Sequence, residues 1–137
     1  MADPLKGETY FPVSGAHQYS DTHWDSNRDG KPDRACDIFA AEGTPLVAVV
    51  AGVVRIQDYP LGGHTAYLVG DNGRDYYYAH MVARSGTGGR VYAGQQIGKV
   101  GRTGNAATTP PHVHWAVGTR GHAADTNGQG DIPPWPV

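Results

Sequence analysis

Two histidines stand one residue apart in "PPHVHWAVG", residues 110–118. Successive side chains of a β-strand point to opposite faces, so His112 and His114 would share one face while Val113 points to the other. Two imidazoles on one face are either a solvated strand surface or part of a metal or acid–base site. The residues that could join them decide between these two interpretations.

Two further segments carry groups that could complete such a site. "YYYAHM" ends an aromatic run with His80, and strand alternation places Tyr78 on the same face. "CDIF" sets Asp37 just before an apolar step. A hydrolytic zinc site needs three protein ligands and an open position for water, and a neighbouring histidine can take the proton of that water. The sequence therefore contains the residue types of a zinc-dependent hydrolase.

Short strands are the elements that must position these residues. The chain has 20 glycines and 10 prolines, spread along it, with β-branched and aromatic runs between them. "GDNG" has the chemistry of a hairpin turn, and the polar residues 16–29 offer no apolar helical stripe. We predict an all-β domain of antiparallel sheets in a sandwich-like arrangement. The expected strands lie within residues 44–57, 64–70, 74–82, 90–101 and 112–118.

The length of 137 residues predicts one domain spanning 1–137. Its core would cover about 36–118, with an irregular N-terminal third that includes 17–37 and a polar tail at 119–137.

Composition excludes several classes of protein. The formal net charge is −2 without a basic run, which predicts no nucleic-acid partner. No apolar stretch reaches the ~18 residues of a membrane span, and the first residues lack the order of a signal peptide, so we expect no membrane insertion. We also expect a monomer.

Cys36 is the single cysteine, so a metal must use nitrogen and oxygen ligands. The H-E-x-x-H, phosphate-loop and G-x-S-x-G motifs are absent from the sequence.

Four segments in order, "GTPLVAVVAGVV", "YYYAHM", "VYAGQQIGKVGRTGNA" and "PPHVHW", resemble the lysostaphin-type (LytM) zinc peptidases, which cut stems or bridges of bacterial peptidoglycan. The resemblance runs from about Cys36 to Val117. It implies Zn²⁺ as cofactor, Asp37 and His114 as ligands, and His80 and His112 as catalytic histidines. It also implies an open groove, peptidoglycan peptides as substrate and action outside the cytoplasm.

The first zinc ligand departs from the common family spacing. That spacing is His-x-x-x-Asp, but the residue four before Asp37 is Asp33. One branch of the family has a His-x-Asp element that "HWD" matches, so we expect His23 to be the ligand, with His17 as the second candidate and Asp33 as the third, because oxygen atoms also bind zinc.

An Asp-rich loop follows His23. "DSNRDGKPD" spaces Asp25, Asn27, Asp29 and Asp33 as in oxygen-rich calcium loops, and it resembles the repeat of thrombospondin type-3 modules. Cys36 stands where an EF-hand has its twelfth-position Glu, so calcium binding and a solvated turn both remain open.

Alternative functions and two weaker site candidates also remain open. Tyr78 and His64 are candidates for the groove, although core packing and an ordinary surface histidine are the simpler interpretations. A non-catalytic wall-binding or hydrolase-activating module of the same fold is the main alternative function. A biotinyl- or lipoyl-type carrier is disfavoured because "VGDNGRD" has no lysine, and nothing marks Cys36 as an activated nucleophile.

The calcium hypothesis predicts a change in stability. If the loop binds calcium, adding calcium to chelator-treated protein should raise its melting temperature, because an ion that binds only the folded state stabilises it. An unchanged melting temperature would leave the solvated turn as the correct interpretation.

Overall fold

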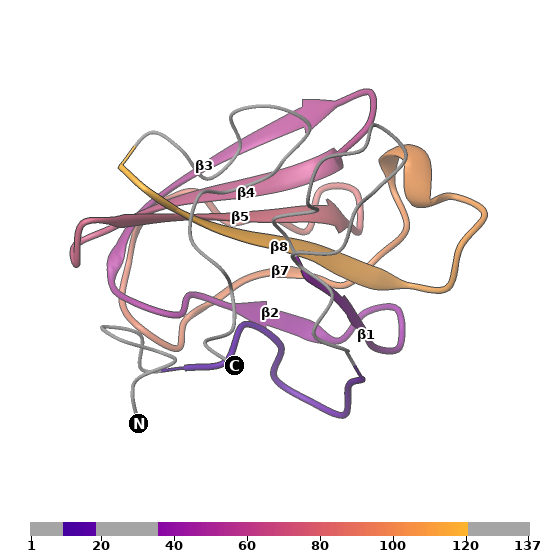
Figure 1. Ribbon diagram of the computed structural model, residues 1–137, viewed down its shortest axis with the longest axis horizontal. Helices are drawn as coiled ribbons and strands as arrows, with labels where there is room; N and C mark the ends of the chain where they lie inside the picture. The colour runs from indigo at the N-terminus through magenta and orange to yellow at the C-terminus, as the bar shows by residue number, and fades with distance from the viewer. Residues whose placement is uncertain (1–9, 19–35, 121–137) are drawn as a thin grey trace.

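The computed structural model describes residues 10–18 and 36–120, and in them it shows strands joined by short turns (Figure 1). The strands are β1 (Cys36–Phe39), β2 (Pro45–Val47), β3 (Gly52–Tyr59), β4 (Gly63–Gly70), β5 (Arg74–Met81), β6 (Gly89–Val91), β7 (Gln96–Lys99) and β8 (His112–Thr119). One short 3-10 helix, η1 (Gly104–Ala106), is the only helix among the described residues. The predicted all-β class is confirmed.

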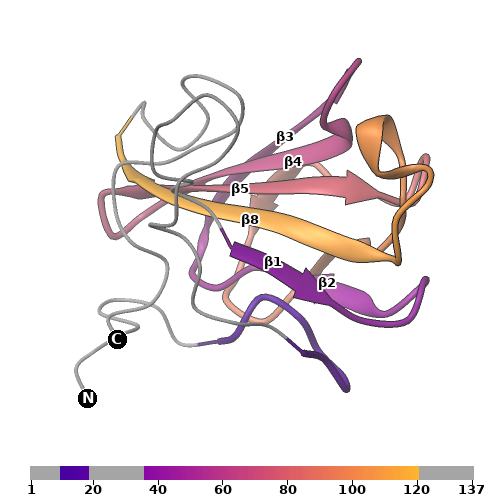
Figure 2. The ribbon, with the colours of Figure 1, turned by 45° about the vertical axis from the view of Figure 1, so that its right-hand side comes forward.

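The strands form two antiparallel sheets. The larger sheet has the order β1-β8-β5-β4-β3-β6, and the smaller is the β2–β7 pair (Figures 1 and 2). β4 and β5 form the hairpin predicted from "GDNG": Gly73 has a φ of 88° and its N–H donates to the Gly70 carbonyl at 3.3 Å. A positive φ is readily adopted by glycine, which explains the residue at this turn.

Two segments expected to be single strands cross between the sheets instead. Residues 44–57 divide into β2, in the small sheet, and β3, in the large one. Residues 90–101 divide in the same way into β6 and β7. The two crossings are hydrogen-bonded to each other, because the N–H groups of Ala48 and Gly94 donate to the carbonyls of Gln95 and Ala48 at 2.9 and 2.8 Å. Hydrophobicity alone could not locate the breaks, since both halves of each segment are buried in one core.

The main core lies between one face of the large sheet and the β2–β7 pair. Trp115, Tyr76 and Tyr78 are its largest buried side chains, and Leu46 and Ile97 close it from the small sheet. Burying a large apolar side chain contributes about 1.5–3 kcal/mol, so these rings supply much of the stability of the sheet.

The opposite face of the large sheet, called the outer face below, carries a second, smaller cluster. Tyr77, Ala79 and Ala116 are buried there, with Tyr67 packed against them. Asp75 lies on this face, 2% exposed, and accepts hydrogen bonds from Tyr67 Oη at 2.8 Å and Arg120 Nη1 at 2.6 Å. Arg120 Nη2 also donates to the Gly70 carbonyl at 2.6 Å, which ties the end of β8 to the β4–β5 hairpin.

None of the helical structure among the described residues has the length and hydrophobicity of a membrane span.

Replacing Asp75 tests the importance of this buried carboxylate. We expect Asp75→Ala to lower the free energy of unfolding by about 1–3 kcal/mol, because it removes the buried carboxylate that accepts hydrogen bonds from Tyr67 and Arg120. Asp71→Ala is the matched control, since Asp71 pairs with Arg90 at 2.7 Å with both side chains more than half exposed. Such a surface pair contributes about 0–1 kcal/mol. Urea denaturation of both variants checks the difference, and equal effects would contradict it.

Candidate functional site

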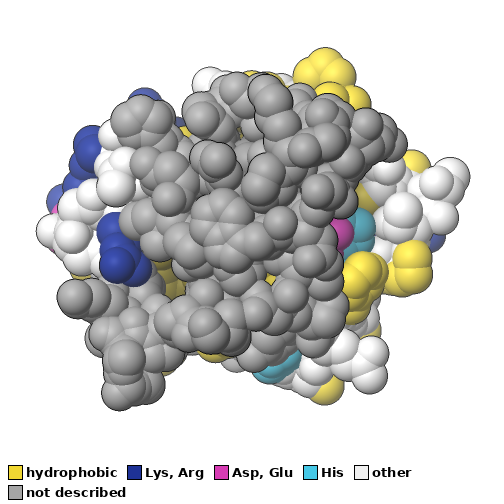
Figure 3. Space-filling model, viewed as in Figure 1, with side chains coloured by type: hydrophobic (Ala, Val, Ile, Leu, Met, Phe, Trp, Pro, Cys, Tyr) yellow, Lys and Arg dark blue, Asp and Glu magenta, His cyan; other side chains and the backbone are white. Residues whose placement is uncertain are grey.

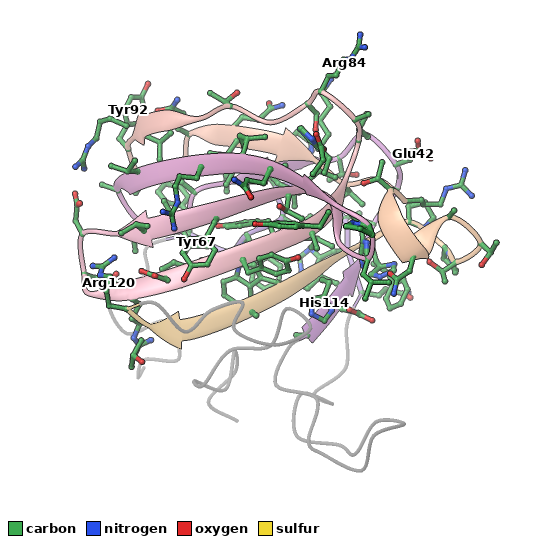
Figure 4. All side chains as sticks on the ribbon, turned by 90° about the horizontal axis from the view of Figure 1, so that it is seen from above. Glu42, Tyr67, Arg84, Tyr92, His114 and Arg120 are labelled. Atoms are coloured by element: carbon green, nitrogen blue, oxygen red, sulfur yellow. The ribbon has the colours of Figure 1, made fainter. Side chains whose placement is uncertain are left out.

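Asp37, His80, His112 and His114 come together at one end of β1, β5 and β8. Asp37 pairs with His114 across β1 and β8, and Ala79 pairs with His114 across β5 and β8. The register thus places the end of β5 beside the acid and the second histidine of the H-x-H motif. Figure 4 shows His114 where β8 meets β1, and Figure 3 shows a histidine and an acidic side chain adjacent at the surface beside hydrophobic side chains.

The closest contact of the site joins His114 and Asp37. His114 Nδ1 donates to Asp37 Oδ1 at 3.1 Å, while His112 Nε2 lies 3.9 Å from Asp37 Oδ2. Burial raises the pKa of Asp37, but the hydrogen bond from His114 and the charges of the neighbouring histidines outweigh burial and hold this pKa below its ordinary value. Asp37 is therefore ionised at neutral pH.

The backbone fixes the orientation of His112. Its Nδ1 donates to the Pro110 carbonyl at 2.9 Å, so a neutral ring carries its lone pair on Nε2, the atom nearer Asp37. The ring also packs against Phe39, with centroids 5.0 Å apart. The rigid proline pair thus holds one imidazole with its basic nitrogen toward the acid.

A β-bulge brings His80 to the same place. The β4–β5 register shifts between His64 and Ala66, and His80 has a left-handed φ of 65°. The ring centroid of His80 lies 5.0 Å from that of His112 and 6.1 Å from that of His114. A bulge inserts an extra residue and so changes the face to which the side chain points.

This bulge corrects the expected grouping of Tyr78 with His80. Tyr78 is fully buried on the core face, where its hydroxyl donates to the Val47 carbonyl at 2.9 Å and accepts from Val49 N at 3.3 Å. Simple alternation fails because the strand is irregular between Tyr78 and His80. Of the two interpretations of Tyr78, the structure supports packing in the core and not a place in the groove.

His80 is held as a neutral imidazole. Its Nδ1 donates to the Thr103 carbonyl at 2.8 Å, which leaves the lone pair on Nε2. Burial lowers the pKa of His80 to about 4. The hydrogen bond to the Thr103 carbonyl acts to raise this pKa but does not offset burial. His80 and His112 thus share one arrangement, in which a backbone carbonyl binds Nδ1 and Nε2 is left as the basic nitrogen.

The remaining expected residues fall in other places. His64 is 8% exposed; its Nδ1 donates to Asp58 Oδ1 at 2.7 Å and its Nε2 accepts from Gly86 N at 3.1 Å, so it anchors the segment after β5. His17 is exposed and stacks on Phe11, with centroids 4.4 Å apart. The expected ligand His23 and the calcium-loop residues Asp25, Asn27, Asp29 and Asp33 lie outside the described residues.

The donor set fits zinc. Two ligands of a tetrahedral zinc, each about 2.0–2.1 Å from the ion, are about 3.3 Å apart, close to the 3.1 Å between Asp37 Oδ1 and His114 Nδ1. Within residues 10–18 and 36–120, no three His, Cys, Asp or Glu side chains form a complete metal site. A zinc ion held by this pair would need a third ligand.

Two parts of the site escaped the sequence interpretation. Tyr77 sets its ring edge-on to His114, with centroids 6.2 Å apart, and alternation opposite the buried Tyr78 could have indicated it. The carbonyls of Thr103 and Pro110 that bind the two histidines have no sequence signal, because any residue type has a carbonyl.

Titration of His80 tests the geometry of the metal-free protein. The pKa of His80 in the folded protein, about 4, lies below the ordinary value of 6.5. Between these values the unfolded chain binds a proton that the folded protein does not, so stability from this group is complete above pH 6.5 and is lost as the pH falls toward 4, at up to about 1.4 kcal/mol per pH unit.

An NMR titration should show one imidazole with a pKa near 4, absent from the spectrum of His80→Gln. A titration of that imidazole near 6.5 would contradict the burial and hydrogen bonding described here.

Comparison with known proteins matches the chain to a family of peptidases. The model of peptidase family M23 matches residues 31–126, more than half of the chain. The peptidoglycan DD-endopeptidase ShyC of Vibrio cholerae is 38% identical over 87 residues, which are 62% of this chain and 20% of ShyC. The chain thus spans about a fifth of the length of that relative.

Solved structures show the same fold. A mutant catalytic domain of the prophage-encoded M23 protein EnpA from Enterococcus faecalis superposes with a TM-score of 0.69 at 27% identity, covering 93% of this chain and 95% of EnpA. The catalytic domain of the antimicrobial peptidase lysostaphin from Staphylococcus simulans gives a TM-score of 0.61 at 28% identity, covering 76% and 80%. The predicted resemblance to lysostaphin is confirmed, and the chain belongs to peptidase family M23.

Proposed function

We propose that this protein is a zinc-dependent endopeptidase that hydrolyses peptide bonds in the stems or cross-bridges of bacterial peptidoglycan. The observation that carries the proposal is the 3.1 Å pair of Asp37 and His114, with two imidazoles beside it whose Nδ1 atoms are bound by backbone carbonyls. A non-catalytic module has no need to hold four such groups in this arrangement.

Zinc would be held by Asp37, His114 and, from the sequence, His23. When bound, it polarises the scissile carbonyl and lowers the pKa of water. Asp37 suits this role because its lowered pKa keeps it ionised at neutral pH. His114 suits this role because its Nδ1 lies 3.1 Å from Asp37 Oδ1, so that both atoms can reach one ion.

His112 and His80 would move the protons of the reaction. His112 Nε2 lies 3.9 Å from Asp37 Oδ2, which favours His112 as the base that accepts a proton from the attacking water. His80 is buried with a pKa lowered to about 4, so it holds a proton weakly. We assign His80 to hydrogen bonding and orientation beside His112, 5.0 Å from it between centroids.

The proposed substrate class is supported by the family and by the relative named above, which is a peptidoglycan DD-endopeptidase. Peptidoglycan peptides lie outside the cytoplasm, so we propose that the protein acts there, as a monomer. A calcium ion in the loop of Asp25, Asn27, Asp29 and Asp33 would be a second cofactor that steadies the chain between His23 and Asp37.

Digestion of purified peptidoglycan tests the function directly. Zinc-loaded protein should release fragments with new peptide amines, read by mass spectrometry from sacculi of several cross-link types. His114→Ala should lower the rate by more than the 10–100-fold typical of residues that only support a ligand. Fragments released equally by His114→Ala would contradict the proposal, and so would intact sacculi after treatment with zinc-loaded wild-type protein.

Zinc stoichiometry separates the candidates for the first ligand. His23→Ala should abolish tight zinc binding, whereas His17→Ala should retain it, because His17 is stacked on Phe11. Both variants are matched in chemistry and differ only in position. Loss of zinc in His17→Ala, with retention in His23→Ala, would assign the ligand to His17 instead.

A further inference from the structure

Thr103 contacts three parts of the structure around His80. Its carbonyl accepts a hydrogen bond from His80 Nδ1 at 2.8 Å. Its hydroxyl donates to the Met81 carbonyl at 2.6 Å and accepts from the backbone N–H of His64 at 3.0 Å. One residue between β7 and η1 is therefore bonded to β4, to β5 and to the imidazole at the end of β5.

These bonds lie at the β-bulge that turns His80 toward the site. His64 and Met81 pair across β4 and β5 next to the register shift, and they are 8% and 0% exposed. A buried backbone group without a partner destabilises the fold, because it has lost its hydrogen bonds to water. The hydroxyl of Thr103 satisfies one such group on each strand, beside a residue whose φ of 65° is strained.

The position of Thr103 is fixed by close contact with the β3–β4 hairpin. A Cβ on Gly63 would lie 2.4 Å from Thr103 Oγ1, and a Cβ on Gly104 would lie 2.2 Å from the Leu61 carbonyl oxygen. Asn105 N donates to that same carbonyl at 2.8 Å. Glycines at 63 and 104 thus let the two loops approach closely enough for the hydroxyl to reach both strands.

We infer that Thr103 is a positioning residue, whose hydroxyl holds the loop so that its own carbonyl keeps His80 Nδ1 bound and His80 Nε2 directed at the site. The inference rests on the proposed function, in which His80 takes part in catalysis. The hydroxyl and the carbonyl belong to one residue, so a shift of the backbone after loss of the hydroxyl bonds moves the acceptor of His80 directly.

Valine and serine at this position separate the hydroxyl from the bulk of the side chain. Thr103→Val keeps the size of the side chain but leaves His64 N–H and the Met81 carbonyl without this partner. We expect kcat to fall about 10–100-fold with KM within about twofold, the pattern of a residue that supports a catalytic group. Thr103→Ser keeps the hydroxyl, and its kcat should stay within about threefold of wild type.

Thr65→Val is the matched control for loss of a buried hydroxyl. Thr65 lies in the same hairpin, is 1% exposed and donates its hydroxyl to the Gln57 carbonyl at 2.9 Å. We expect this variant to lose stability while keeping kcat. A fall in kcat as large as that of Thr103→Val would show a general effect of destabilising the hairpin and would overturn the inference.

NMR of the metal-free protein gives a readout that needs no activity. Nitrogen-15 spectra of the imidazoles should show His80 protonated on Nδ1 in the wild type and in Thr103→Ser, and a mixture of both tautomers in Thr103→Val. An unchanged tautomer in Thr103→Val would overturn the inference. If the tautomer changes although the wild-type protein cleaves no peptidoglycan, the positioning role stands and the proposed function fails.

The wild-type protein offers a test that does not depend on the folding of a variant. The hydroxyl proton of Thr103, held by the Met81 carbonyl, should exchange with water slowly enough to be seen by NMR. A rapidly exchanging hydroxyl would contradict the contacts on which the inference rests.

Discussion

The pairing of β1 with β8 is the constraint on which the whole site depends. Only in this register does Asp37 lie opposite His114, so that a carboxylate from one strand and an imidazole from its neighbour meet at 3.1 Å. A shift of β1 by one residue would turn Asp37 to the core, because strand side chains alternate between faces, and the same shift of β8 would turn His114 there. The buried partners in the same strands, Ile38 and Trp115, prevent that shift, since they would then leave the core.

The large sheet thus carries packing residues on one face and residues of the site on the other. The core face of β5 and β8 holds Tyr76, Tyr78 and Trp115, and the outer face holds His114 and Tyr77. Apolar packing fixes the strands, and the backbone then supplies fixed carbonyls to the two remaining histidines. The pKa values agree with this arrangement, because Asp37 is held ionised while His80 is held neutral.

The class of fold and the residue types of the site could be predicted from the sequence, because particular residues indicate them. The H-x-H pair predicted a shared face from strand period alone, and the β4–β5 hairpin followed from its Asn and Gly turn. Strand alternation put Tyr78 on the face of His80, and the structure separates the two because a bulge depends on tertiary contacts, here those of His80 with the Gly62 and Thr103 carbonyls. The role of Thr103 also required the folded loops, since its two partners are 22 and 39 positions away in the chain.

A crystal structure of the zinc-loaded protein, with the metal located by anomalous scattering at the zinc edge, tests the central claim most directly. Our account predicts one zinc ion bound by a carboxylate oxygen of Asp37 and by His114 Nδ1, at about 2.0–2.2 Å from each. His80 and His112 should stand beside it with their Nε2 atoms toward the open side. Zinc bound elsewhere in the protein, with Asp37 and His114 still hydrogen-bonded to each other, would contradict the account.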